Sequence, residues 1–166
     1  MKNIILIGMP GAGKSTIGVI LAKTLGLDFI DTDLVIQHRE KRILQDIIDD
    51  DGIKGFIKVE EDAILSLDCE DSVIATGGSV VLSEEAMEHL KKLGTVIFID
   101  VSYKEIERRI RNITTRGIVK SKDKSLFDTY NERLPFYKKF ADVTVIAKNK
   151  TSESIVTEIK VTLDVF

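Results

Sequence analysis

Short apolar runs alternate with amphipathic stretches along the 166 residues of this chain. We predict five strands from these runs, because continuous aliphatic residues over three or four positions are typical of strands buried in a parallel sheet. The predicted strands are Ile4–Ile7, Asp28–Ile30, Val73–Ala75, Val96–Ile99 and Val143–Ile146.

The segments between these strands have the apolar period of helices. In the stretch 14–25, Ile17, Ile20 and Leu21 fall on one side, and Gly26 supplies a stop. Further helical segments are predicted at 34–67, 84–92, 103–110, about 125–140 and about 152–163. Strands that alternate with helices predict an α/β fold. Right-handed crossovers then give three layers, α/β/α, around a five-stranded parallel sheet.

The first strand leads directly into a phosphate-binding motif. Residues 8–15, Gly-Met-Pro-Gly-Ala-Gly-Lys-Ser, match G-x-x-x-x-G-K-[ST] between a buried strand and an amphipathic helix. In such a loop the backbone N–H groups and the helix N-terminus hold phosphate, the lysine reaches the β- and γ-phosphates, and the serine faces Mg²⁺. The motif predicts the P-loop NTPase architecture with ATP and Mg²⁺ as ligands. The alternative, a glycine-rich turn that only caps a helix, is far weaker for a full match.

Two carboxylates follow the second predicted strand. Asp31 and Asp33 stand one residue apart where that strand ends, at the sheet edge where open α/β folds bind ligands. One carboxylate can hold Mg²⁺ while the other accepts the proton of an acceptor hydroxyl. The alternative is that one of them only caps the helix that begins near Leu34.

With these motifs in place, the chain resembles the shikimate kinase family over nearly its whole length. The resemblance is carried by the phosphate loop and four further segments. These are Phe29–Asp33, Ala75–Ser79, Thr115–Gly117 and Arg133–Tyr137.

The resemblance implies roles for individual residues on the acceptor side. Asp33 would orient the attacking hydroxyl, and Arg133 would pair with the carboxylate of the acceptor. The backbone of Gly77 and Gly78 would approach the acceptor closely, and Ser79 would belong to the same site. The alternative for Arg133 is a surface ion pair with Asp128 or Glu132.

On the nucleotide side, the resemblance implies that Ser15 and Asp31 hold Mg²⁺, that Arg116 closes over the transferring phosphate, and that Arg109 lies along the adenine together with the loop 147–152. The alternative for Arg116 is a solvated loop charge. The predicted catalytic residues are Lys14, Asp33 and Arg116. The predicted ATP-binding residues are Gly8, Gly11, Ala12, Gly13, Lys14, Ser15, Thr16, Arg109 and Arg116.

The acceptor half departs from the family pattern. The family has a Gly-Glu pair, then a Phe-Arg pair, then a Glu. This chain keeps Gly52, Phe56 and Glu60. Ile53 replaces the acid of the first pair, and Ile57 replaces the arginine of the second. The third glycine of the family's triple glycine is Ser79, which would narrow the acceptor site or add a hydrogen bond. Lys58 is a poor substitute for the arginine, because neighbouring helix positions point about 100° apart.

Composition excludes several other classes of function. Lysine and arginine number 24 against 27 acidic residues, so there is no basic surplus for nucleic acid. A lone cysteine, Cys69, excludes an internal disulfide and fits a reducing compartment. The N-terminal apolar run is shorter than the apolar core of a signal peptide, and no later window is long enough to span a bilayer. We therefore expect a cytoplasmic enzyme with no nucleic-acid or membrane partner.

No linker rich in Pro, Gly or Ser divides the chain, which predicts a single kinase domain over 1–166. A helical insertion at about 34–67 would enclose a small substrate, and a polar segment at about 112–124 would form a lid. The run Asp49–Asp51 is interpreted as a solvated loop, with a metal cluster as the weaker alternative. Three functions stay open: shikimate kinase, a kinase of another small hydroxylated molecule, and a nucleotide-binding regulator without turnover.

Overall fold

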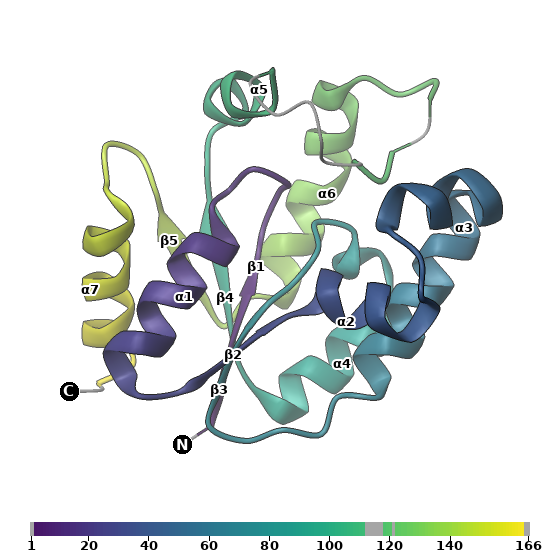
Figure 1. The fold of residues 1–166 in the computed structure, drawn as a ribbon. Helices are drawn as coiled ribbons and strands as arrows, with labels where there is room; N and C mark the ends of the chain where they lie inside the picture. Colours follow the sequence, from purple (N-terminus) through teal and green to yellow (C-terminus); the bar gives the residue numbers. More distant parts are fainter. Residues whose placement is uncertain (1, 112–117, 121, 165–166) are drawn as a thin grey trace.

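The computed structural model describes residues 2–111, 118–120 and 122–164, and Figure 1 shows its arrangement. Within this part of the chain, five parallel strands form one sheet in the order β2-β3-β1-β4-β5. The strands are β1 (Asn3–Ile7), β2 (Asp28–Asp31), β3 (Ser72–Ala75), β4 (Gly94–Asp100) and β5 (Val143–Ile146). Every residue of β1 and β3 is buried, as the aliphatic runs predict for strands covered on both faces.

Helices cover both faces of this sheet, which confirms the predicted α/β class with three layers (Figure 1). The helical elements are α1 (Lys14–Leu25), α2 (Thr32–Glu40), α3 (Leu44–Leu65), the 3₁₀ turn η1 (Val80–Leu82), α4 (Glu84–Leu93), α5 (Tyr103–Arg111), α6 (Leu126–Phe140) and α7 (Ser152–Thr162). Helices α1 and α7 contact each other on one side of the sheet, while α4 and α6 contact β4 on the other. None of the described helices is both long and apolar enough to cross a membrane.

The helical segments predicted at 34–67 are present as two helices, the first of which begins slightly earlier, at Thr32. Helix α2 starts at Thr32, and the chain turns at Lys41, whose φ is 53°, before α3 starts at Leu44. Inside α3, Gly52 has φ 72° and ψ −180°, so two helical segments meet at a kink. The left-handed φ is favourable for glycine and explains why the break falls there.

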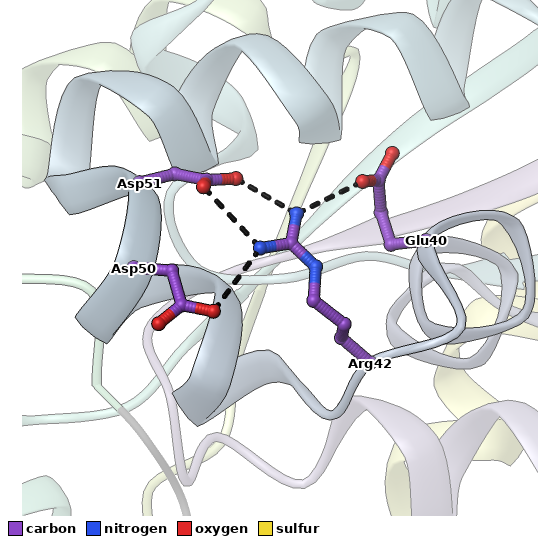
Figure 2. Close-up of polar contacts among 4 residues, drawn as sticks. All are labelled: Glu40, Arg42, Asp50 and Asp51. Carbon is purple, nitrogen blue, oxygen red and sulfur yellow. Dashed lines mark hydrogen bonds and ion pairs between the residues drawn. The ribbon is translucent and has the colours of Figure 1, made fainter.

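Asp49–Asp51 lie in the first segment of α3, so the prediction of a solvated loop there is wrong. Figure 2 shows the reason: Arg42, in the turn between α2 and α3, spreads its guanidinium over acidic groups from both helices. Its two terminal nitrogens donate to Asp51 at 3.2 and 2.8 Å, and Nη2 also donates to Glu40 at 3.1 Å. The local sequence does not reveal this pairing. Arg42 lies in the turn before α3, whereas Asp51 lies about two helical turns inside that helix.

The carboxyl ends of the parallel strands meet at one edge of the sheet, and the candidate site residues follow them there. The loop 8–13 follows β1, Asp31 ends β2, residues 76–79 follow β3, and the loop 147–151 follows β5. In register, Asp31 lies beside Ala75 and Ile7 beside Phe98, so these loops start at nearly the same level. The topology therefore assembles the site from segments far apart in the sequence.

Candidate active site

The loop 8–15 joins β1 to α1 in the conformation that the phosphate-binding motif predicts. Gly11 and Gly13 have φ values of 80° and 88°, a region that other residues rarely occupy. Gly13 caps α1 without a side chain, so the first N–H groups of the helix face the loop. The Lys14 side chain is buried, and its Nζ donates to the carbonyl oxygens of Gly8 and Met9, both at 2.7 Å. The loop thus holds a cation and helix N–H groups around one point.

Asp31 links the phosphate loop to α2. Its Oδ1 accepts from the backbone N–H of Asp33 at 3.0 Å, which caps α2, and its Oδ2 accepts from Ser15 Oγ at 3.1 Å. Asp31 therefore caps α2, but capping is not its sole contact, because the same carboxylate also bonds the phosphate loop. Two hard oxygen donors at the mouth of a phosphate loop fit Mg²⁺, which usually takes one or two protein ligands and completes its shell with phosphates and water. In the described residues no group of three or more His, Cys, Asp or Glu forms a denser metal site.

A cavity of about 370 Å³ lies between the phosphate loop, α2, α3, the loop after β3 and α6. Its wall contains the predicted residues Lys14, Ser15, Asp31, Asp33, Gly77, Gly78, Ser79 and Arg133. Acidic and basic groups thus face one space of the size of a small metabolite. The sequence prediction that these positions come together is met by the geometry, while their roles stay predictions.

Arg133 is the cation on the α6 side of this cavity. Only 3% of the residue is exposed, and its Nη2 donates to the carbonyl oxygen of Val119. Its Nη1 is buried and has no hydrogen-bond partner among the described residues. The alternative of a surface ion pair is wrong, because Asp128 closes the capping box of α6 and Glu132 pairs with Lys124. A buried guanidinium with an unpartnered nitrogen in a cavity wall is suited to an anionic group of a ligand.

The two glycines after β3 leave room where side chains would collide. A Cβ at Gly77 would lie 2.7 Å from Glu60 Oε2 and 3.2 Å from Asp33 Oδ1, and one at Gly78 would lie 2.5 Å from Pro10 Cδ. The Gly78 carbonyl accepts from the Tyr137 hydroxyl at 2.6 Å, a contact that fixes this backbone from α6. The glycines therefore let the phosphate loop, α2 and α3 converge on the cavity.

Glu60 is a buried carboxyl in the same wall. Only 2% of it is exposed; Ser79 Oγ donates to its Oε1 at 2.7 Å, and its Oε2 has no partner among the described residues. Burial raises the pKa of Glu60 to about 7, although Ser79, Arg133 and Lys14 lower it, and the nearby Asp33 raises it further. The hydroxyl of Ser79, predicted to face the acceptor, is thus bonded to another wall residue.

This shift predicts a pH-dependent contribution of Glu60 to stability. Between pH 4.5 and 7 the folded chain keeps this carboxyl protonated while the unfolded chain ionises it, so raising the pH through 7 favours unfolding. From pH 5 to 8, wild type should lose roughly 2 to 3 kcal/mol of unfolding free energy relative to Glu60→Gln. Urea unfolding of both proteins at the two pH values measures this difference. A difference that does not change with pH would contradict the shift.

Of the three positions that depart from the family pattern, Ser79 lines the cavity, whereas Ile53 and Ile57 are not among the described residues that line it. Ile53 packs against a small apolar cluster around Phe56 and Val119 and so belongs to the local core. Lys58 is mostly exposed and pairs with Glu61 and Asp62 at 2.8 and 3.1 Å, so it does not replace the missing arginine.

A second cavity, of about 630 Å³, adjoins the outer side of the phosphate loop. Ala12 and Thr16 line it, together with Arg109 and with Ala147, Lys150 and Ser152 from the loop after β5. Arg109 Nη1 donates to the Gly11 carbonyl at 3.0 Å, and its Nε donates to Glu105 at 2.9 Å. The residues predicted to lie along an adenine therefore surround one space beside the loop. Gly8 lines neither cavity; it accepts from Lys14.

Arg116 and most of the predicted lid at 112–124 lie outside the described residues. Of the part that is described, Val119 is buried and lines the first cavity. Sequence reasoning named Glu60 only as a matching position, and did not place Thr76 or Gln37 in the wall. Glu60 follows the apolar residue Ile57 by three positions, and this local pattern is not distinctive. The sequence therefore gives little indication that Glu60 lies in the cavity wall.

Comparison with known proteins decides the family. The family model described as shikimate kinase matches residues 10–164. The chain belongs to the shikimate kinase family. Among its relatives, the shikimate kinase of Rippkaea orientalis is 44% identical over 161 residues, spanning 95% of this chain and 85% of its own. That of Bacillus mycoides is 34% identical over 160 residues, spanning 96% and 97%.

A solved shikimate kinase from Acinetobacter baumannii, in complex with shikimate, has a TM-score of 0.89 at 26% identity and covers 99% of this chain and 94% of its own. The chain is therefore a small-molecule kinase with a hydroxyl acceptor, and the predicted family and P-loop fold class are confirmed. Members of this family use ATP as co-substrate.

Proposed function

We propose that this shikimate kinase family member transfers the γ-phosphate of ATP to a ring hydroxyl of shikimate. In this proposal the 370 Å³ cavity takes the acceptor and the second cavity takes the adenine. The observation that carries the proposal is Arg133 Nη1, which is buried, has no hydrogen-bond partner among the described residues, and lies in the same cavity wall as Asp33 and the phosphate loop. A carboxylate held by Arg133 would orient a hydroxylated ring toward the loop.

On the nucleotide side, Lys14 would leave the carbonyls of Gly8 and Met9 for the β- and γ-phosphates, beside the N-terminus of α1. Ser15 and Asp31 would hold Mg²⁺, since their oxygens already meet at 3.1 Å. The ion would neutralise charge on the phosphate oxygens. Arg109 would lie against the adenine, and Arg116 would supply a further cation as the lid closes; both roles are carried over from the family.

On the acceptor side, Asp33 would accept the hydrogen bond of the attacking hydroxyl and take its proton as the oxygen bonds to the γ-phosphorus and ADP leaves. The capped N-terminus of α2 holds Asp33 in place through its backbone N–H. Because transfer to phosphorus depends mainly on position and charge, the residues that orient the acceptor govern the rate.

Asp33→Asn is expected to lower kcat by about a hundredfold or more while the KM for ATP changes little, because the amide cannot take the proton. Steady-state kinetics with ATP and shikimate as varied substrates measure both constants. Asp28→Asn, at an exposed position of β2, is the matched control and should behave as wild type. A variant that lost ATP affinity but kept its turnover would remove Asp33 from the acceptor role.

The proposed function itself is tested by ³¹P NMR of the enzyme with ATP, Mg²⁺ and shikimate. A new phosphomonoester signal that grows as ADP forms supports phosphorylation of a ring hydroxyl. Inorganic phosphate as the sole product would contradict it. The expectations of a cytoplasmic location and of no nucleic-acid or membrane partner stay predictions.

A further inference from the structure

Glu60 is buried on α3 without a basic side chain from its own helix. Ile57, one helical turn earlier, is the position from which a side chain would reach Glu60, and it is apolar. Lys58, the next basic residue, turns away to Glu61 and Asp62. Burying a carboxyl costs free energy unless its oxygens find hydrogen-bond donors. Among the described residues, a donor is present for one oxygen only, and this donor is the hydroxyl of Ser79.

Ser79 has no other role in its own element that would explain a hydroxyl there. It stands at the start of η1 but makes no side-chain cap, and only 2% of it is exposed. Its Oγ lies 2.7 Å from Glu60 Oε1. The family pattern has a glycine at position 79 and an arginine at position 57. Ser79 and Ile57 are therefore two departures from this pattern, and both change the surroundings of the Glu60 carboxyl.

The other oxygen of Glu60 faces the space over Gly77. A Cβ at Gly77 would sit between Glu60 Oε2 at 2.7 Å and Asp33 Oδ1 at 3.2 Å, so the two oxygens flank one point in the cavity wall. Arg133 Nη1 belongs to the same wall. Among the described residues, Arg133 Nη1 and Glu60 Oε2 are thus a buried donor and a buried acceptor without hydrogen-bond partners. A ligand with a carboxylate and several hydroxyls has the complementary groups.

We propose that Glu60 is a specificity-determining residue whose Oε2 accepts a hydrogen bond from a second, non-reacting hydroxyl of the acceptor, and that Ser79 positions it. The inference rests on the proposed function and deepens it. In this acceptor site, Arg133 would bind the carboxylate, and the Ser79–Glu60 pair would bind a hydroxyl. This pair would compensate for the second arginine, which the family pattern has at position 57.

The test is steady-state kinetics of wild type, Ser79→Ala and Ser79→Gly, with shikimate and with an analogue in which one non-reacting ring hydroxyl is replaced by hydrogen. For both variants the KM for shikimate should rise about tenfold or more, while kcat and the KM for ATP change less than about threefold. For the analogue that lacks the contacted hydroxyl, this penalty should nearly vanish. A merely structural role would penalise both acceptors equally.

The chain offers a matched control one residue further along α3. Ser83 Oγ donates to Glu61 Oε2 at 2.6 Å, and this second Ser–Glu pair does not line the cavity. Ser83→Ala should leave the KM for shikimate unchanged. Adding Ile57→Arg to Ser79→Gly restores the family pattern and should recover most of the lost affinity, because an arginine at 57 lies one helical turn from Glu60.

The outcomes separate the two claims. If wild type turns over shikimate but Ser79→Ala and Ser79→Gly keep its KM, or if the penalty is the same for every analogue, the inference is overturned and the proposed function stands. If wild type shows no shikimate-dependent turnover, the proposed function fails and the inference fails with it.

Discussion

Lys14→Ala is expected to lower kcat by about a thousandfold or more, with little change in thermal stability. The Lys14 ammonium is a buried cation of the phosphate loop, and it donates to the carbonyl oxygens of Gly8 and Met9. In the transition state it would face the charge that develops on the transferring group.

Coupled detection of ADP release measures this effect, and circular dichroism during heating follows the fold. Lys23→Ala, on the exposed side of the same helix, removes an equal charge away from the loop and should retain activity. Turnover of Lys14→Ala near the wild-type rate would show that the loop does not bind the transferred phosphate.

Arg133→Met is expected to raise the KM for shikimate by about a hundredfold or more, while the KM for ATP stays close to that of wild type. The methionine keeps much of the buried stem but removes the guanidinium, so the carboxylate of the acceptor would enter the cavity without its partner. The effect should be large, because the missing arginine at 57 leaves Arg133 as the cation on the acceptor side of the described wall, with Lys14 on the phosphate side.

Separate titrations with ATP and with shikimate distinguish loss of acceptor binding from damage to the whole site. Lys138→Met, at an exposed position of α6, is the matched control and should leave both constants unchanged. Equal loss of ATP and acceptor affinity would indicate that Arg133 supports the fold through its bond to Val119 and does not bind the acceptor.

Local signals account for the parts of the fold that could be predicted. The bounds of α1 and of β5 agree with the sequence prediction at both ends, because a glycine stop ends the helix and a β-branched run defines the strand. The phosphate loop could be predicted as well, since its motif, its strand and its helix are contiguous. Asp31 and Asp33 could be placed because parallel strands end at a common edge.

The parts that could not be predicted depend on contacts between distant residues. The family pattern indicates an altered acceptor position at Ile53, whereas the structure places this residue against an apolar cluster that includes Ile36 of α2 and Val119. The acidic run Asp49–Asp51 predicts a solvated loop, whereas in the structure it is helical and Asp51 accepts two hydrogen bonds from Arg42. The meeting of Glu60 with Ser79 joins positions 19 residues apart and leaves no local pattern.

The most direct test of the account is the rate of ADP release with ATP and Mg²⁺, measured with no acceptor, with shikimate, and with a panel containing a sugar acid and an amino-alcohol. We predict that shikimate alone raises the rate well above the acceptor-free level, and that Arg133→Met abolishes this increase at the same shikimate concentration. Stimulation by another member of the panel but not by shikimate, with ATP binding intact, would contradict the account and identify a kinase of a different small hydroxylated molecule.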